Sequence, residues 1–492
     1  MPDILLATLN AKYQHAALGL RYLRANLGEL HSRSLILEFD INQRPLDIAE
    51  QLLAHDPKII GLGLYIWNAS QTTEVAALLK TIRPDVVLIL GGPEISFEIE
   101  AQPIARLADH IVTGEADLEF ANLCRQILAG TRPASKVIHA EPPDLTTLVL
   151  PYDEYSDADL AHRWIYVETS RGCPFKCEFC LSSLRPGIRR FPLDKSLVQF
   201  NRLLDRGARR FKFVDRSFNI DLDACCTVLD FFLERLTPDL FLHFEMIPDR
   251  LPEPVCSRIQ KFPKGTLHLE VGIQTFNPDV AARIHRHQKY PEIENNLRFL
   301  RHHTEAAIHA DLIIGLPGEN LHSIATGFDR LLALEPHEIQ VGILKRLRGT
   351  TIDRHAAEWG LLFSPSPPYE ILQNNLIDFP TMQRLRRFAH FWEIIGNSGN
   401  FMETLPLLWA PNKSPFKEFL ALSDWIYTIE GRRHGIALER LAQLLFKYLT
   451  NVQSHSPDRV AQLLARDYVR PGRREPPPFL KPYLPKPHAT HT

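Results

Sequence analysis

Three cysteines, Cys173, Cys177 and Cys180, lie within eight residues of one another in the spacing CxxxCxxC. They follow a predicted strand at residues 164–168, so we expect them on a loop between a strand and a helix. Three thiolates this close together can hold three irons of a four-iron cluster and leave one iron without a protein ligand. An iron with an open coordination position can bind and activate a small molecule.

A structural zinc site is the alternative for the same thiols. Such a site closes with four ligands, usually from two paired knuckles, and the chain has no second CxxC. His162 would have to supply the fourth ligand. The spacing therefore favours a 4Fe-4S cluster. The other cysteines fall in predicted helices, where a thiol usually acts as a small buried hydrophobic group: Cys124, Cys225, Cys226 and Cys256.

The segment SRGCPFKCEFC at residues 170–180 resembles the radical S-adenosylmethionine (radical SAM) superfamily, whose signature has an aromatic residue, here Phe179, before the last cysteine. The resemblance implies that the open iron chelates the amino and carboxylate groups of S-adenosylmethionine. One electron from the cluster then cleaves it to a 5′-deoxyadenosyl radical, which abstracts hydrogen from an unactivated carbon. A protein electron donor such as flavodoxin or ferredoxin is implied as a partner.

Further segments carry this resemblance, which extends from residue 164 to about residue 350. Glu270 and Gln274 lie where the family places polar contacts to the cofactor; a structural role is the alternative. Asp311 and Gly315 belong to the segment DLIIGLPGE, which resembles the strand that runs beside the adenine; an ordinary strand-to-helix turn is the alternative. The polar stretch DRSFN at residues 215–219 follows another strand and is expected to face the cleft.

These residues sit in a predicted α/β array at residues 164–352. Six apolar strands separated by helical patterns predict a partial (β/α)6 TIM-like barrel, with its functional face at the carboxyl ends of the strands. The predicted strands are residues 164–168, 211–214, 241–246, 267–272, 306–314 and 338–344.

The remaining carboxyl-terminal region divides into two predicted parts. Residues 353–469 are expected to be mainly helical, with the clearest amphipathic stretches at 383–395 and 436–449. Residues 470–492 are rich in proline and are predicted to be a disordered tail.

The amino-terminal residues 1–130 predict a doubly wound, flavodoxin- or Rossmann-like parallel sheet, followed by a linker at 131–163. Ligands of such sheets bind beyond the carboxyl ends of the strands. The predicted strands are residues 3–7, 34–39, 58–65, 86–90 and 110–113.

A doubly wound domain ahead of a radical SAM barrel resembles the cobalamin-binding subgroup of the superfamily. His15 departs from the DxHxxG motif that supplies a histidine to cobalt, because the loop reads YQH followed by Gly19. Cobalamin is therefore expected without a protein histidine on the metal. The resemblance implies cofactor contacts from four loops: Asn10 and Tyr13; Tyr65 and Trp67; Gly91, Gly92 and Glu94; Gly114 and Glu115.

The combined resemblance implies a radical methyltransferase acting on an unactivated carbon of an unidentified substrate. One S-adenosylmethionine methylates cobalt, and a second generates the radical. Three alternatives remain open: rearrangement or cyclisation with cobalamin in another role or absent, a first domain that only docks a partner, and a non-catalytic cobalamin or iron-sulfur sensor. Methylthiotransferases are disfavoured because their first domain supplies additional cluster cysteines, whereas residues 1–130 hold only Cys124.

The composition predicts a globular, cytoplasmic protein with no membrane partner. The 492 residues include 56 basic and 58 acidic side chains, a net charge of -2, which is too balanced to predict attraction to nucleic acid or membranes. The composition disfavours nucleic acid as a partner. The alternative rests on arginines near the cysteine motif or in the same domain: Arg185, Arg189, Arg190, Arg209 and Arg210. Four histidines are expected on an exposed basic face: His285, His287, His302 and His303.

Overall fold

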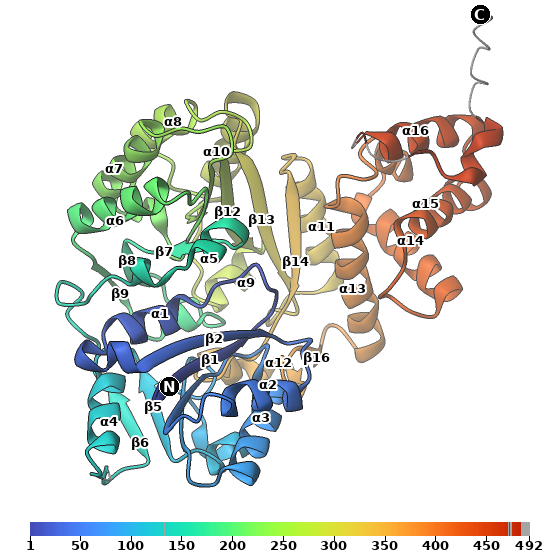
Figure 1. The fold of residues 1–492 in the computed structure, drawn as a ribbon. Coiled ribbons are helices and arrows are strands. Elements are labelled where there is room, and N and C mark those ends of the chain that lie inside the picture. The colour runs from blue at the N-terminus through green and yellow to red at the C-terminus, as the bar shows by residue number, and fades with distance from the viewer. Residues whose placement is uncertain (132, 471, 473–474, 484–492) are drawn as a thin grey trace, which may run out of the picture.

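The computed structural model describes residues 1–131, 133–470, 472 and 475–483. This part of the chain contains two parallel sheets of six strands, one in the amino-terminal domain and one in the barrel (Figure 1). The carboxyl-terminal helices pack beside the barrel strand β14 (Glu338–Ile343).

The amino-terminal sheet has the strand order β2-β1-β3-β4-β5-β6. Helices α1 and α4 cover one face and helices α2 and α3 the other, and each face has its own apolar core. The predicted doubly wound fold is confirmed. The strands are β1 (Ile4–Asn10), β2 (Ser34–Asp40), β3 (Ile59–Gly63), β4 (Val87–Gly91), β5 (His110–Gly114) and β6 (Val137–Ala140). The helices are α1 (Leu18–Ala25), α2 (Pro45–Leu53), α3 (Ala69–Ile82) and α4 (Glu119–Leu128).

The segment expected to be a linker is partly ordered into regular structure. Strand β6 pairs with β5 and forms the edge of the sheet. The prolines of this segment lie before and after the strand, so they do not remove any of its backbone hydrogen-bond donors. Helix α5 (Asp157–His162) begins at Ser156, whose side chain caps the helix together with Asp159.

The second sheet forms the predicted six-stranded partial barrel, with the parallel order β14-β13-β12-β11-β10-β7. Its strands are β7 (Ile165–Val167), β10 (Arg210–Phe213), β11 (Phe241–Met246), β12 (Leu267–Gln274), β13 (Ala307–Ile314) and β14. Its helices are α6 (Leu193–Asp205), α7 (Leu222–Leu233), α8 (Glu253–Ile259), α9 (Pro278–Arg283), α10 (Tyr290–His303) and α11 (Leu321–Leu332).

Strands β12 and β13 alternate strictly between buried and partly buried residues. The buried set, such as Leu269 and Val271, belongs to the apolar core. The alternate set on β12, such as His268 and Glu270, faces the concave side of the curved sheet. The inside of the barrel is therefore polar at these strands.

A hairpin that the sequence did not predict carries the cysteines. Strand β8 (Ser170–Cys173) pairs antiparallel with β9 (Gly187–Arg190). Gly172 has a φ of 95°, and a Cβ there would collide with the carbonyl oxygen of Gly187. Glycine is thus required at the base of the cysteine loop.

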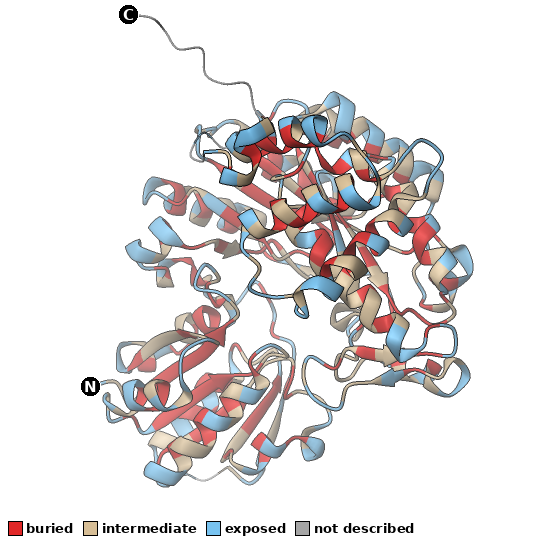
Figure 2. Cartoon of the chain, turned by 90° about the vertical axis from the view of Figure 1, so that its right-hand side faces the viewer, coloured by how far each residue is buried: buried red, intermediate tan, exposed pale blue. Residues whose placement is uncertain are grey.

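The carboxyl-terminal helices share one continuous core with the barrel. The Phe328 ring of α11 lies 4.7 Å from Trp392 and 5.1 Å from Phe388 between ring centroids. Figure 2 shows buried residues concentrated on the inward faces of these helices. The elements are α12 (Ala356–Trp359), β15 (Leu362–Phe363), β16 (Ile371–Gln373), α13 (Phe379–Phe391) with a π-helical extension (Trp392–Gly396), α14 (Pro415–Glu430), α15 (Leu438–Lys447) and α16 (Pro457–Val469).

The predicted disordered tail begins too early. Pro478–Tyr483 form a 3-10 helix in which Leu480 is fully buried. The Phe479 and Tyr483 rings contact Phe446, so these apolar residues hold the segment against α15 despite its prolines. Residues 471, 473–474 and 484–492 of the predicted tail lie outside the described residues. Within the described residues, no helix has the length and apolarity needed to cross a bilayer.

Candidate functional site

The three cysteines of the CxxxCxxC motif line one cavity of about 350 Å³ at the carboxyl ends of the barrel strands. Cys173 and Cys177 are buried, and Cys180 is half-buried. Burial raises the pKa of the Cys173 and Cys177 thiols, while Arg286, whose Nη1 lies 3.6 Å from the Cys177 Sγ, opposes this rise at Cys177. The loop thus presents three thiols to one enclosed space.

Four other predicted residues line the same cavity: Phe179, Glu270, Gln274 and Asp311. Gly315 does not line it. Gly315 has a φ of 97°, and a Cβ there would lie 2.6 Å from the Ile371 side chain, so this glycine lets β16 pack closely against the barrel.

Two of the barrel carboxyls that line the cavity, Glu270 and Asp311, have pKa values shifted in opposite directions. Burial alone would raise the pKa of Glu270. A 3.0 Å hydrogen bond from His243 Nε2 and the charge of Lys212 outweigh burial and lower this pKa to about 2. Burial, with Glu270 and Glu245 nearby, raises the pKa of Asp311 well above its usual value. Glu270 is therefore an ionised acceptor, whereas Asp311 takes up a proton more readily than a solvent-exposed carboxyl.

Arg286 and His287 are functional-site residues that the sequence reasoning missed. Both line the cavity, and Arg286 also donates to the carbonyl oxygen of Gly272. The four histidines expected on an exposed face are exposed, but His287 also borders the cavity, because helix α9 ends at Arg283 and the chain turns at His285, where φ is 53°. Arg216, within the polar stretch predicted to face the cleft, also lines the cavity and pairs with Glu245 at 2.9 Å.

Glu178 lies between Cys177 and Cys180, and its buried carboxylate binds the cysteine loop to neighbouring segments. It is buried and accepts from His355 Nε2 at 2.7 Å. His285 Nδ1 lies 3.0 Å from the same carboxylate, and Arg354 also pairs with it. The cysteine loop is thereby tied both to the turn after α9 and to the 3-10 helix Thr351–His355.

A second cavity of about 660 Å³ lies between the amino-terminal sheet and the cysteine hairpin. Three predicted residues line it: Gly92, Gly114 and Glu115. Leu181, Ser182 and Arg216 line both this cavity and the cysteine cavity. The two cavities therefore adjoin.

The other predicted residues of the amino-terminal loops lie outside the second cavity. Tyr65 and Gly91 line a separate space of about 70 Å³, and the Tyr65 ring stacks on Trp67 with centroids 4.5 Å apart. Glu94 is buried, pairs with Arg348 at 2.8 Å and accepts from the Tyr369 hydroxyl. These side chains support the loops rather than line the large cavity.

The loop after β1 packs against the barrel and so connects the two domains. Asn10 donates to Glu38 at 3.0 Å, and Arg163 lies over the Tyr13 ring. His15 Nδ1 lies 2.6 Å from the Tyr166 hydroxyl of barrel strand β7. Asn10 and Tyr13 miss both cavities because this loop packs directly on the barrel, a long-range contact that the sequence does not reveal.

Ion pairs that line the second cavity link the amino-terminal domain to the cysteine hairpin of the barrel. Arg171 of the hairpin pairs with Glu115, Asp117 and Glu168 at 2.9–3.0 Å. Burial raises the pKa of Glu168 to about 7, against the opposing charge of Arg171. Four arginines considered for nucleic acid have carboxylate partners within the chain: Arg185 and Arg189 with Glu115, Arg190 with Asp221, and Arg209 with Asp239.

Three family models match consecutive parts of the chain. Residues 4–124 match the B12 binding domain, and residues 167–331 match the radical SAM superfamily. Residues 357–487 match a family described as a protein of unknown function, DUF4080.

Curated relatives match part of the chain. An uncharacterized methyltransferase, PH0819 of Pyrococcus horikoshii, is 28% identical over 232 residues, 42% of this chain and 49% of the relative. The 2-(S-pantetheinyl)-carbapenam-3-carboxylate methyltransferase of Streptantibioticus cattleyicolor is 25% identical over 64% of this chain and 51% of the relative. The chain thus spans about half the length of these relatives.

A solved structure shares the fold over most of the chain. It is the cobalamin-dependent S-adenosylmethionine radical enzyme OxsB with aqua-cobalamin and S-adenosylmethionine bound. The match has a TM-score of 0.62 at 12% identity and covers 96% of this chain and 79% of that one.

Proposed function

Because the chain is a radical SAM protein with an amino-terminal B12-binding domain, we propose that it transfers a methyl group to an unactivated carbon of a substrate bound beside the cysteine cavity. The observation that carries this proposal is the shared wall of the two cavities at Leu181, Ser182 and Arg216. Reacting groups held in adjoining cavities meet without diffusing through solvent. The relatives named as methyltransferases favour methyl transfer over other radical reactions.

The donor set of the cysteine cavity fits a 4Fe-4S cluster. Cys173, Cys177 and Cys180 would each bind one iron, and their burial would limit solvent access to it. Arg286 donates toward the Cys177 sulfur, and such a hydrogen bond tunes the potential of a cluster.

The rest of this cavity fits the polar ends of S-adenosylmethionine. The ionised Glu270 would bind cationic or hydroxyl groups, and Asp311 would add a second carboxyl on the neighbouring strand. Gln274 would add an amide on the same wall. Phe179 supplies an apolar surface.

The second cavity fits cobalamin by its position beside the loops that follow β4 and β5, because ligands of doubly wound sheets bind beyond the carboxyl ends of the strands. The backbone of these loops is held in place by glycines that pack against neighbouring carbonyl groups. Gly92 has a φ of 107° and Gly114 a φ of 81°, and at each a Cβ would lie within 3.0 Å of a carbonyl oxygen. Glu115 borders the space. When bound, the cluster supplies one electron to S-adenosylmethionine, and the cobalamin carries the methyl group to be transferred.

Arg216 is proposed to orient the substrate. It lies on the boundary between the cavities, with Glu245 fixing its guanidinium. An electron donor of the flavodoxin or ferredoxin type completes the proposal as the physiological reductant.

The test is anaerobic reconstitution of the full chain with iron, sulfide and cobalamin, followed by S-adenosylmethionine and a strong chemical reductant. We expect 5′-deoxyadenosine together with stoichiometric retained cobalamin in the wild type. Cys177→Ala should form no 5′-deoxyadenosine, whereas Cys256→Ala, a half-buried cysteine outside both cavities, should match the wild type.

The remaining outcomes separate the alternatives. Cleavage without retained cobalamin would reduce the first domain to a docking module. Retained cofactors without any cleavage would contradict the radical mechanism and favour a sensor. A methyl group absent from every product, despite cleavage and retained cobalamin, would favour rearrangement or cyclisation.

A further inference from the structure

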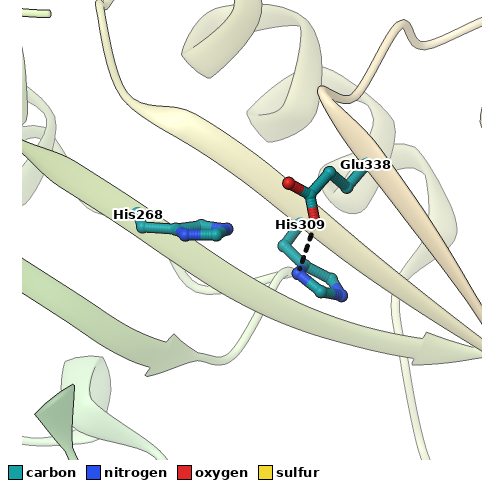
Figure 3. Close-up of side chains that lie close together, drawn as sticks. All are labelled: His268, His309 and Glu338. Atoms are coloured by element: carbon teal, nitrogen blue, oxygen red, sulfur yellow. Dashed lines mark ion pairs between the residues drawn. The ribbon is translucent and has the colours of Figure 1, made fainter. Parts of the chain in front are cut away.

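Three neighbouring barrel strands present metal-binding side chains to one point (Figure 3). They are His268 of β12, His309 of β13 and Glu338 of β14, and their ligand atoms all lie within 4.8 Å of one another. Strand register explains the grouping, because His309 lies opposite Glu338, and His268 lies two residues before Glu270, which is opposite His309. The cluster therefore borders the cysteine cavity, since Glu270 lines that cavity, and His268 lies nearer the amino-terminal end of β12.

The imidazoles of this cluster have nitrogen atoms free to bind a cation. His309 Nε2 is buried and makes no hydrogen bond, and its nearest acidic atom is Asp311 Oδ1 at 3.4 Å. His309 Nδ1 lies 3.3 Å from Glu338 Oε2. The His268 ring lies 5.6 Å from the His309 ring and 5.2 Å from the His243 ring between centroids, so these imidazoles gather at one place inside the barrel.

The surroundings of the cluster also suit a cation. Glu270 and Asp311 are the next inward-facing carboxyls along β12 and β13. Lys212 is the cation on their other side, 4.0 Å from Glu270 Oε2. Strand β14 is the last strand of the sheet, and the Glu338 side chain is 39% exposed, which leaves a path for an ion to enter.

We propose that His268, His309 and Glu338 bind a divalent ion of the zinc class inside the barrel. Two imidazoles and one carboxylate are a donor set of three-ligand zinc sites, which keep a fourth position for water. An ion held there ties together three strands, two of which carry Glu270 and Asp311 two residues further on. This site is separate from the cysteines and does not depend on the proposed methyl transfer.

The test measures zinc in the cluster-reconstituted full chain after dialysis against buffer containing zinc chloride. The variants are His268→Ala and Glu338→Gln, the latter keeping the size of the side chain. His303→Ala is the matched control, since this histidine is exposed at the end of α10. We expect a zinc ion per chain in the wild type and the control, loss of that ion in both variants, and equal iron in all four proteins.

Thermal unfolding with and without zinc guards against a folding defect in the variants. Zinc should raise the Tm of the wild type and of His303→Ala but leave the Tm of Glu338→Gln unchanged. Equal zinc in all four proteins would overturn the proposal, and so would a wild type that retains no zinc or gains no thermal stability from it.

Discussion

The two adjoining cavities are built from different parts of the polypeptide. Charged and polar side chains of the barrel line the cysteine cavity, including Glu270, Asp311, Arg216 and Arg286. Loops from the carboxyl ends of the amino-terminal strands, with Gly92 and Gly114 at close backbone contacts, form one wall of the second cavity. The barrel thus lines its cavity with charged and polar side chains, whereas the amino-terminal domain lines the second cavity partly with backbone at glycines.

Arg171 lines the second cavity and joins the cysteine hairpin to the amino-terminal domain, and its removal should have the largest effect. Arg171→Gln leaves the carboxylates of Glu168, Glu115 and Asp117 without this guanidinium. We expect a loss of about 3 to 5 kcal/mol in the free energy of unfolding, measured by denaturant titration, together with weaker cobalamin retention.

The control for this prediction is Arg125→Gln. Arg125 pairs with Glu29 on the surface of the same domain, where both side chains are largely exposed. Its loss should cost about 1 kcal/mol or less. Equal effects of the two substitutions would mean that Arg171 does not bind the domains together.

The shape of the second cavity is tested at Gly92. Gly92→Ala introduces a Cβ 2.5 Å from the Leu64 carbonyl oxygen at a φ of 107°. We expect a loss of about 3 kcal/mol in the free energy of unfolding and reduced retention of cobalamin, measured by absorbance after gel filtration.

Gly130→Ala is the control that distinguishes the effect of a steric clash from the effect of a positive φ alone. Gly130 also has a positive φ, 78°, but a Cβ there meets no atom within 4 Å. It should cost about 1 kcal/mol and leave cobalamin retention unchanged. Unchanged retention in Gly92→Ala as well would contradict a cavity defined by its backbone.

The polarity of the barrel should appear as a pH dependence at Glu319. Burial raises the pKa of Glu319 to about 7, while hydrogen bonds from Thr275 and Ser323 oppose the rise. Between about pH 4.5 and pH 7 the folded state keeps this proton and the unfolded state does not, so stability falls as pH rises across this window and the contribution is constant above it. The slope from one proton is at most about 1.4 kcal/mol per pH unit.

Glu319→Gln should remove that component. The measurement is the difference between wild-type and variant unfolding free energies at several pH values from 5 to 8. A difference that does not change with pH would mean that Glu319 titrates normally.

The smallest effect is expected at Trp67. Its ring stacks on Tyr65 and its Nε1 donates to the Leu9 carbonyl oxygen, outside the large cavity. Trp67→Ala should cost about 1 kcal/mol and leave the affinity for cobalamin within about twofold. A large loss of cobalamin affinity with little loss of stability would instead support the contact expected from the sequence.

Local signals in the sequence predicted most of the scaffold. The apolar strands of both sheets were found within a few residues because each is a continuous buried run. Strand β6 and the hairpin β8 and β9 were missed, since they are short, and SRGC has no apolar pattern. Leu480 was missed because prolines surround it.

The candidate site was predictable in the barrel and less so in the amino-terminal loops. Cysteine spacing and polar residues within apolar strands pointed to Glu270, Gln274 and Asp311, which line the cavity. Arg286 escaped because a run of basic residues resembles an exposed surface. Asn10 and Glu94 lie outside the large cavity because their loops pack on distant parts of the chain, through His15 on Tyr166 and through Glu94 on Arg348.

The arginine contacts between the amino-terminal domain and the rest of the chain have a kinetic consequence. Arg171 holds one side of the inter-domain boundary, and Arg348 with Glu94 and Glu98 holds another. A large molecule seated between the domains can leave only when such contacts break, so we expect its residence time to span many turnovers. Loading is then expected to be slow and to take place once for many catalytic cycles.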